Sequence, residues 1–129
     1  MKRIVFFLII SCVSMGAFAQ NQNNPIPLVS PDSAIVYRLF PTRNTWTFLK
    51  LNTRNGQLWQ VQWDTGKSRF EIPLSLKPLV TAEEERHGRF FLYPTQNIYN
   101  FILLDQLDGR MWQVQWSHEM EDRLVVPIE

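Results

Sequence analysis

The residues of this chain that could recognise a ligand are tryptophans and glutamines, which occur twice in one pattern. Trp59-Gln60-Val61-Gln62-Trp63 returns 53 positions later as Trp112-Gln113-Val114-Gln115-Trp116. An exposed indole offers an apolar face on which a sugar ring can stack, and the glutamine amide both donates and accepts hydrogen bonds. The pattern therefore suggests two ways to bind a ligand, aromatic stacking and amide hydrogen bonding. Each also has a structural explanation that involves no ligand.

The aromatic residues are either a stacking platform for sugars or the core of the domain. The possible platform consists of Trp46, Trp59, Trp63, Tyr99, Trp112 and Trp116. We favour the core, because large aromatics on an alternating strand face supply most of the apolar area that a domain without cysteine needs. The predicted core comprises Trp46, Phe48, Trp59, Val61, Trp63, Tyr99, Phe101, Trp112, Val114 and Trp116.

The polar residues that alternate with these aromatics form the candidate ligand-binding set. They are Gln60, Gln62, Gln113, Gln115, Asn100 and Thr47. Threonine, lysine or arginine would serve equally well on a solvated strand face, so glutamine at four equivalent sites hints at amide recognition. The alternative, which we favour, is cross-strand hydrogen bonding within the sheet.

Other polar clusters fit structural roles better than catalytic ones. Asp105 and Asp108 with Gly109 lack the further carboxylates of a calcium loop. The charged run 83–87 has no nucleophile at a readable spacing, and His118 has no second histidine at metal-ligand spacing. No serine or threonine stands in a nucleophile elbow. The sequence therefore predicts no enzyme, no metal site and no cofactor.

The first nineteen residues have the pattern of a secretory signal peptide. Lys2 and Arg3 precede an apolar stretch that ends at Ala17-Phe18-Ala19, a small-residue cleavage site. We expect residues 1–19 to be removed and the protein to be periplasmic or secreted. The alternative is a lipoprotein anchored at Cys12, which follows Ile9-Ile10-Ser11. Neither case leaves a membrane span after cleavage.

The composition of the chain after the predicted signal peptide limits the classes of partner that it could bind. Its only cysteine belongs to the signal, so apolar packing must stabilise the domain without disulfides. Loss of Lys2 and Arg3 changes the formal charge from +1 to −1, and the remaining charges are scattered. Nothing in this balance favours nucleic acid.

The chain divides into a flexible leader at 20–32 and one β domain at 33–129. Residues 40–63 and 93–116 share eleven identities in 24 positions, which defines repeat one at 33–77, a linker at 78–87 and repeat two at 88–129. Thr81 and Glu84 form a capping box, so the linker is expected to hold one short helix. The runs elsewhere are rich in β-branched and aromatic residues and are punctuated by turn residues, as is typical of strands.

The centre of each repeat predicts a β-hairpin. Asn52 and Gly56 open and close the turn of repeat one, and Asp105 and Gly109 do so in repeat two. A four-residue loop pairs Asn52 with Gln57. The same register sets Phe48 opposite Val61 and Trp46 opposite Trp63, with Leu103 opposite Trp112, Phe101 opposite Val114 and Tyr99 opposite Trp116 in repeat two.

This register gives each hairpin one aromatic face and one glutamine-bearing face. We expect the two repeats to hide each other's aromatic faces. The predicted fold is all-β, with two tandem antiparallel meanders related by a pseudo-twofold axis in a sandwich or partly closed barrel of six to eight short strands. Pro73 and Pro127 place the last strand of each repeat at a sheet margin. The alternative treats each repeat as a blade of an incomplete propeller, which requires oligomerisation.

The repeated unit also resembles known sequences. Tyr93-Pro-Thr-Gln-Asn97, Phe101-Ile-Leu-Leu-Asp105 and Trp112 to Trp116 resemble a recurrent hairpin of an uncharacterised family of small secreted bacterial proteins. The Leu-Asp-x-x-x-Gly-x-x-Trp portion is similar, over about ten residues, to hairpins of quinoprotein-type propeller blades. The likeness implies a strand-turn-strand unit, with no catalytic residue and no cofactor.

These observations favour a non-catalytic binding module of the bacterial cell envelope that recognises a glycan or an envelope protein. A second possibility is a structural protein that assembles through its sheet edges, with homo-oligomers as its sign. The third is a small hydrolase or inhibitor whose loops carry the function.

Overall fold

The computed structural model describes residues 30–129. The predicted signal peptide, the alternative anchor at Cys12 and most of the predicted leader lie outside these residues. Within the described part, no helix is long and apolar enough to cross a membrane.

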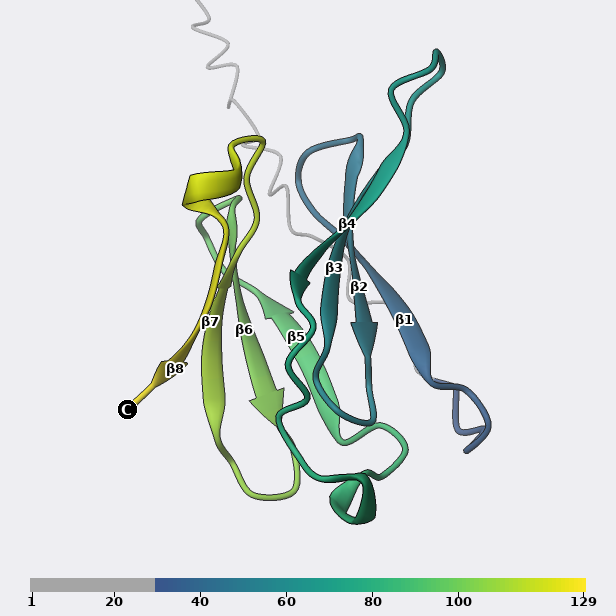
Figure 1. Cartoon of the computed structure of the whole chain (residues 1–129), viewed down its shortest axis with the longest axis vertical. Coiled ribbons are helices and arrows are strands. Elements are labelled where there is room, and N and C mark those ends of the chain that lie inside the picture. Colours follow the sequence, from purple (N-terminus) through teal and green to yellow (C-terminus); the bar gives the residue numbers. More distant parts are fainter. Residues whose placement is uncertain (1–29) are drawn as a thin grey trace, which may run out of the picture.

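Eight antiparallel strands form two separate four-stranded sheets that lie side by side (Figure 1). Sheet one contains β1 (Tyr37–Pro41), β2 (Thr47–Asn52), β3 (Leu58–Gln62) and β4 (Phe70–Ser75). Sheet two contains β5 (Phe90–Pro94), β6 (Asn100–Asp105), β7 (Met111–Gln115) and β8 (Leu124–Ile128). Each sheet follows chain order, so each is a simple meander. The prediction of an all-β fold built from two tandem repeats is confirmed.

The predicted hairpin register is also confirmed in both repeats. Phe48 pairs with Val61 across β2 and β3, and Leu103 pairs with Trp112 across β6 and β7. The turn of repeat one closes where the Asn52 amide donates to the Gln57 carbonyl at 2.9 Å. Gly56 and Gly109 close the two turns with φ of 84° and 81°, which is the left-handed region that glycine enters without strain.

The prolines near the end of each repeat lie on edge strands, as predicted. Pro73 pairs with Trp59 and Pro127 pairs with Trp112, each on the outermost strand of its sheet. Proline has no N–H to donate to a further strand, so β4 and β8 each end a sheet.

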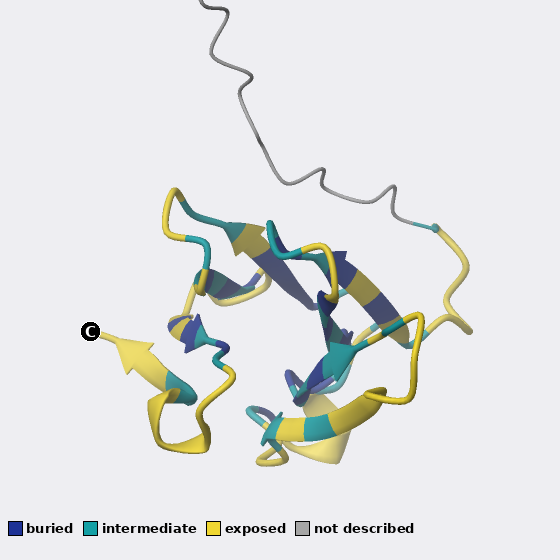
Figure 2. Ribbon diagram, turned by 90° about the horizontal axis from the view of Figure 1, so that it is seen from above, coloured by how far each residue is buried: buried dark blue, intermediate teal, exposed yellow. Residues whose placement is uncertain are grey.

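The two sheets present different faces to each other, which corrects the expected mutual burial of the aromatic faces. We call the face with Trp59, Val61 and Trp63, or Trp112, Val114 and Trp116, the front face of its sheet, and the glutamine-bearing face the back face. The back face of sheet one packs on the front face of sheet two. Buried residues accordingly alternate with exposed ones along the strands (Figure 2).

Burial of equivalent residues shows this front-to-back packing directly. Leu49 and Gln60 on the back of sheet one are fully buried, as are Val114 and Trp116 on the front of sheet two. A twofold axis would bury the same face of both sheets, so the repeats are not related by the expected pseudo-twofold. The two repeats instead bury opposite faces against each other.

The core therefore contains only part of the predicted set. Phe101, Trp112, Val114 and Trp116 of sheet two belong to it. Phe48, Trp59 and Val61 of sheet one are half-buried. Trp46, Trp63 and Tyr99 are exposed by 40%, 42% and 42%, so their prediction as core residues is wrong. Their place is taken by aliphatic and phenylalanine side chains: Phe40, Leu49, Leu51, Leu58, Val80, Phe90, Phe91, Leu92 and Leu103.

The linker joins the repeats through a short 3-10 helix, η1 (Ala82–Glu84). The Glu84 carboxylate accepts hydrogen bonds from the Thr81 amide and hydroxyl at 3.2 and 2.9 Å, at the predicted capping box. Before this turn, the Leu79 amide donates to the Asn55 carbonyl at 2.8 Å and Val80 enters the core. The linker is thus seated on the hairpin turn of repeat one. A second such helix, η2 (Met120–Asp122), precedes β8.

Candidate functional site

The predicted ligand-binding residues do not form one site, because the two sheets bury opposite faces. Thr47 and Gln60 are fully buried between the sheets, and Gln62 is half-buried. Gln113, Gln115 and Asn100 lie on the outer, back face of sheet two. Thr47 and Gln60 are therefore out of reach of a ligand, whereas Gln113, Gln115 and Asn100 remain accessible.

Gln60 has a structural role between the repeats. Its Nε2 donates to the Ser117 carbonyl at 3.1 Å, and its Oε1 accepts from the Ser117 amide at 3.3 Å. One side-chain amide thus bonds both backbone groups of a residue in the other repeat, just after β7. The Gln62 Oε1 is buried without a hydrogen-bond partner among the described residues.

Gln113, the equivalent of Gln60, has no sheet packed against it. Its Nε2 donates to Asn100 Oδ1 at 2.7 Å across the hairpin, which is the cross-strand use of the amide that the sequence favoured. Gln115 Nε2 donates to the Asp122 carbonyl at 2.7 Å and so ties η2 to the sheet.

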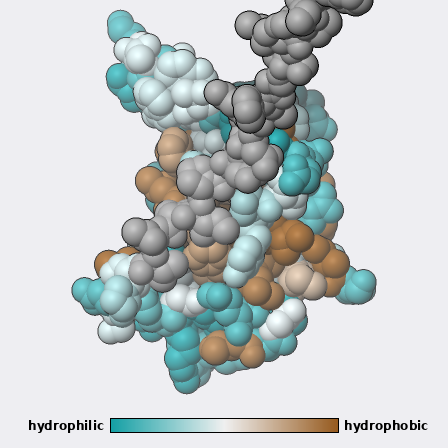
Figure 3. Space-filling view, turned by 180° about the vertical axis from the view of Figure 1, so that it is seen from behind, coloured by the Kyte–Doolittle hydropathy of each residue, from teal (hydrophilic) through white to brown (hydrophobic). Residues whose placement is uncertain are grey.

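The most exposed aromatic surface is the front face of sheet one. Tyr37 and Leu39 on β1 are exposed by 54% and 51%, and Trp46 and Trp63 flank the hairpin. Hydrophobic side chains also reach the rear surface of the molecule at mid-height, whereas the segment that projects at the upper left is white to teal (Figure 3). An apolar surface that continues over several strands marks an interaction site more often than scattered single residues do.

Trp63 is held rigidly in spite of its exposure. Its Nε1 donates to the Thr45 carbonyl at 2.8 Å, and its ring lies 4.7 Å from that of Trp46 with an interplanar angle of 53°. Trp116 makes the same contacts in sheet two, with the Ile98 carbonyl at 2.9 Å and with Tyr99 at 4.9 Å. The exposed indole is therefore already in the conformation that its buried counterpart adopts.

One charged pair lies within the front face of sheet one. Lys50 pairs with Glu71, and its ammonium lies 4.7 Å from the Trp59 ring centroid and 5.4 Å from that of Tyr37. The corresponding places on the buried front face of sheet two hold Leu103 and Val125. The contacts of Lys50 with the two rings leave the aromatic surface continuous across the ion pair.

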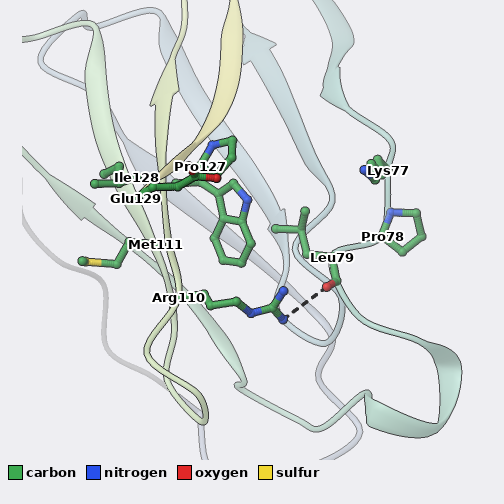
Figure 4. A pocket seen from close by; sticks show the side chains of 9 residues that line it. Lys77, Pro78, Leu79, Arg110, Met111, Pro127, Ile128 and Glu129 are labelled. Atoms are coloured by element: carbon green, nitrogen blue, oxygen red, sulfur yellow. Dashed lines mark hydrogen bonds between the residues drawn. The ribbon is translucent and has the colours of Figure 1, made fainter.

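A cavity of about 340 Å³ opens between the linker and the ends of β7 and β8. Figure 4 shows Lys77, Pro78 and Leu79 on one side and Arg110, Met111 and Pro127 on the other. The Arg110 guanidinium bridges the two sides by donating to the Leu79 carbonyl at 3.4 Å. It also pairs with Asp108 at 2.7 Å and Asp105 at 3.5 Å. Because Arg110 already pairs with these two carboxylates, which Arg89 also contacts, its guanidinium serves to join the turn of repeat two to the linker.

A second cavity, of about 380 Å³, lies at the opposite end of sheet two. His118 forms part of its wall and places its ring 5.5 Å from that of Trp116, edge to face. Glu119 and Asp122 also contribute to the wall. The histidine packs on an aromatic ring here, and within residues 30–129 no group of three or more His, Cys, Asp or Glu side chains is placed to hold a metal ion.

The pKa shifts in the described part belong to turns. Amide hydrogen bonds from Ser68 and Gly66 lower the pKa of Asp64, and hydrogen bonds from Thr81 lower that of Glu84. The backbone amide of Arg110 lowers the pKa of Asp108, and the Asp108 side chain in turn raises that of Arg110. Each shift favours the charged form of a residue that stabilises a local turn, and none prepares an acid or base for proton transfer.

Sequence reasoning missed Tyr37 and Leu39 as surface residues. These two residues lie on β1, which turns Arg38 and Phe40 inward. The alternation of side chains shows that two faces exist, and it carries no signal for which face the other repeat covers. No family model, curated protein or solved structure matches the chain.

Proposed function

We propose that this protein is a non-catalytic interaction module of the bacterial cell envelope, and that it binds another protein through the front face of sheet one. The signal-like segment at 1–19 supports export. The contact surface consists of Tyr37, Leu39, Trp46, Phe48, Trp59 and Trp63, with the Lys50–Glu71 pair beside them.

One observation carries this proposal: the front face of sheet one is exposed, whereas the same face of sheet two is covered by a β-sheet. Trp63 is 42% exposed and Trp116 is fully buried, although their hydrogen bonds and ring partners correspond. A rigid, exposed tryptophan surrounded by apolar side chains has the composition of an interface hot spot.

The chemistry of the face favours a protein partner over a glycan. A sugar site needs polar side chains placed around the stacking ring to orient the hydroxyl groups. The neighbours of Trp63 and Trp46 on this face are Val61 and Phe48, and its charged groups, Lys50 and Glu71, pair with each other. The face therefore offers apolar area with few unused hydrogen-bonding groups.

The test is a comparison of three immobilised proteins exposed to an envelope extract of the producing cell. Wild type, Trp63→Arg and Met120→Arg are used, and the retained proteins are identified and quantified. Met120 is 76% exposed and lies in η2, outside the strands of both sheets, so Met120→Arg is a matched control for the added charge. We expect wild type and Met120→Arg to retain the same partner and Trp63→Arg to retain at least tenfold less of it.

Equal retention by all three proteins would contradict the proposal. The same samples are titrated with purified envelope polysaccharides while tryptophan emission is followed. A saturable shift that disappears in Trp63→Arg would replace the protein partner by a glycan.

A further inference from the structure

We propose that the partner of the front face of sheet one is a second copy of this chain, which applies the back face of its sheet two. This inference rests on the proposed function and names its partner. The copies would stack head to tail and continue between chains the packing that joins the two repeats within one chain.

The molecule already contains one example of the interface. Inside the chain, the back face of one repeat covers the front face of the next. Among residues 30–129, each chain then has one uncovered front face, on sheet one, and one back face, on sheet two, that is uncovered apart from Phe91, which packs on Phe40. Residues equivalent to Tyr37, Leu39 and Trp63 on the covered front face are Phe90, Leu92 and Trp116, and all three are fully buried.

The unused back face is apolar as well. Tyr93, Met111, Val126 and Ile128 are exposed by 37% to 45%, and Ile102 and Leu104 are half-buried between them. In sheet one, the residues equivalent to Met111, Ile102 and Leu104 are Leu58, Leu49 and Leu51. These three are fully buried against sheet two. The two unused faces thus have the apolar character of the two faces that meet in the core.

The residues equivalent to those that make the polar contact between the repeats lie on or beside the two uncovered faces. Gln60 of sheet one bridges to the backbone of Ser117. The equivalent residues are Gln113 on the unused back face and Asp64 beside the unused front face. Arg69 Nε donates to the Asp64 carbonyl at 3.1 Å, as Arg123 Nε does to the Ser117 carbonyl at 2.9 Å. The Asp64 carbonyl thus accepts the same arginine hydrogen bond as the Ser117 carbonyl.

A backbone hydrogen bond between the two sheets also has equivalent groups at the two uncovered ends of the chain. The Phe90 amide donates to the Thr53 carbonyl at 2.8 Å, which joins the start of sheet two to the turn of sheet one. The equivalents are the Tyr37 amide at the start of sheet one and the Gln106 carbonyl in the turn of sheet two. In a head-to-tail pair these two groups belong to different chains and would meet in the same way.

The sequence before each repeat adds an independent observation. Pro78-Leu79-Val80-Thr81 in the linker corresponds to Pro27-Leu28-Val29-Ser30 ahead of repeat one. Within the chain, Leu79 and Val80 are the residues that seat the linker on the preceding hairpin turn. The sequence ahead of repeat one thus repeats the apolar pair of the linker.

An interface between two different faces leaves one face unused at each end and therefore propagates until it closes into a ring. Four-stranded blades stacked in this sense close into propellers of about four to eight blades, which corresponds to about two to four copies of a two-blade chain. The Lys50–Glu71 pair makes the interface less apolar than the core, so we expect association to be reversible and dependent on concentration.

The test uses two variants that block opposite faces. Trp63→Arg blocks the front face and Gln113→Arg blocks the back face. Sedimentation of wild type should show a discrete oligomer of at least two chains, which dissociates on dilution. Each variant alone should sediment as a monomer, and their equimolar mixture should form a heterodimer, because the intact front of one fits the intact back of the other. Met120→Arg should behave as wild type.

Chemical cross-linking tests the same junction when a single interface is weak. In a Cys12→Ser background, Asp64→Cys and Gln113→Cys are mixed and treated with a short bis-maleimide. The mixture should give a cross-linked dimer, whereas neither protein alone should. Cross-linking within Asp64→Cys alone would indicate a front-to-front dimer and would overturn the head-to-tail proposal.

The inference also fails if wild type is monomeric at every concentration and the mixture gives no cross-linked dimer. If Trp63→Arg nevertheless loses an envelope protein that wild type retains, the proposed function stands and its partner is a different protein. If Trp63→Arg retains every partner, the proposed function fails as well.

Discussion

Trp63 and Trp116 make the same hydrogen bond and ring contact in the two repeats, yet one indole is 42% exposed and the other is fully buried. Local sequence therefore decides how each tryptophan is held, and the packing of the sheets decides which one is covered. The difference separates a residue of the core from a residue available to a partner.

The two tryptophans should contribute unequally to the stability of the fold. Trp116→Ala should lower the free energy of unfolding by about 3–5 kcal/mol, because it leaves a cavity in the core. Trp63→Ala should lower it by about 1 kcal/mol or less, since its ring is already partly solvated. Urea unfolding in dilute solution, where chains are separate, measures both. Equal losses would show that both indoles are covered within one chain.

Gln60 and Gln113 should also contribute unequally to the free energy of unfolding, and the buried residue should again contribute more. Gln60→Ala removes a buried amide and takes its partner from the Ser117 N–H, while the Ser117 C=O keeps the hydrogen bond from Arg123 Nε. It should therefore cost about 1–3 kcal/mol of unfolding free energy. Gln113→Ala removes an exposed amide that contacts only Asn100, and it should be nearly neutral in dilute solution. Thermal unfolding of the two variants side by side distinguishes them. A large loss for Gln113→Ala would place its face inside the fold.

Asp105 should be the carboxylate on which the fold depends most. It is fully buried, and both its oxygens lie 3.0 Å from Arg89 Nε. Asp105→Ala leaves the buried guanidinium without this partner and should destabilise the protein by about 3–5 kcal/mol. Asp108→Ala, in the same turn but exposed, should have a much smaller effect. Chemical denaturation of both variants gives the comparison, and similar losses would refute the role assigned to burial.

Alanine substitution of the two turn glycines should show whether the linker packs on the hairpin turn of repeat one. Gly56→Ala and Gly109→Ala both place a side chain at positive φ, at a similar conformational cost of about 1 kcal/mol. A Cβ at Gly56 would also come within 2.7 Å of Leu79 Cδ1, whereas one at Gly109 meets nothing within 4 Å. Gly56→Ala should therefore melt at the lower temperature. The reverse order would mean that Leu79 does not sit on this turn.

The hairpins were predictable because their information is local. Turn residues and alternation specify the pairing of Phe48 with Val61 without reference to the rest of the chain. The linker turn at Thr81 and Glu84 was predictable for the same reason. Pro73 and Pro127 placed the edge strands, because a missing N–H has the same consequence in any fold.

The packing of the sheets was not predictable in this way. Near-identical sequences around Trp63 and Trp116 give no reason to expect different burial, so mutual burial of like faces was the simplest expectation. Only the less similar positions carry the distinction, because Lys50 and Glu71 stand where sheet two has Leu103 and Val125. The buried Arg89–Asp105 pair was missed because Asp105 also fits its turn without any partner.

Hydrogen exchange of the indole N–H groups tests the front-to-back arrangement most directly. Trp63 and Trp116 donate matching hydrogen bonds, so only coverage by the other sheet should separate their exchange rates. The measurement is made by nuclear magnetic resonance on Gln113→Arg, in which the proposed association is blocked and both tryptophans are intact. We predict that the Trp116 signal outlasts the Trp63 signal by at least tenfold. Equal protection of the two indoles would contradict the front-to-back arrangement.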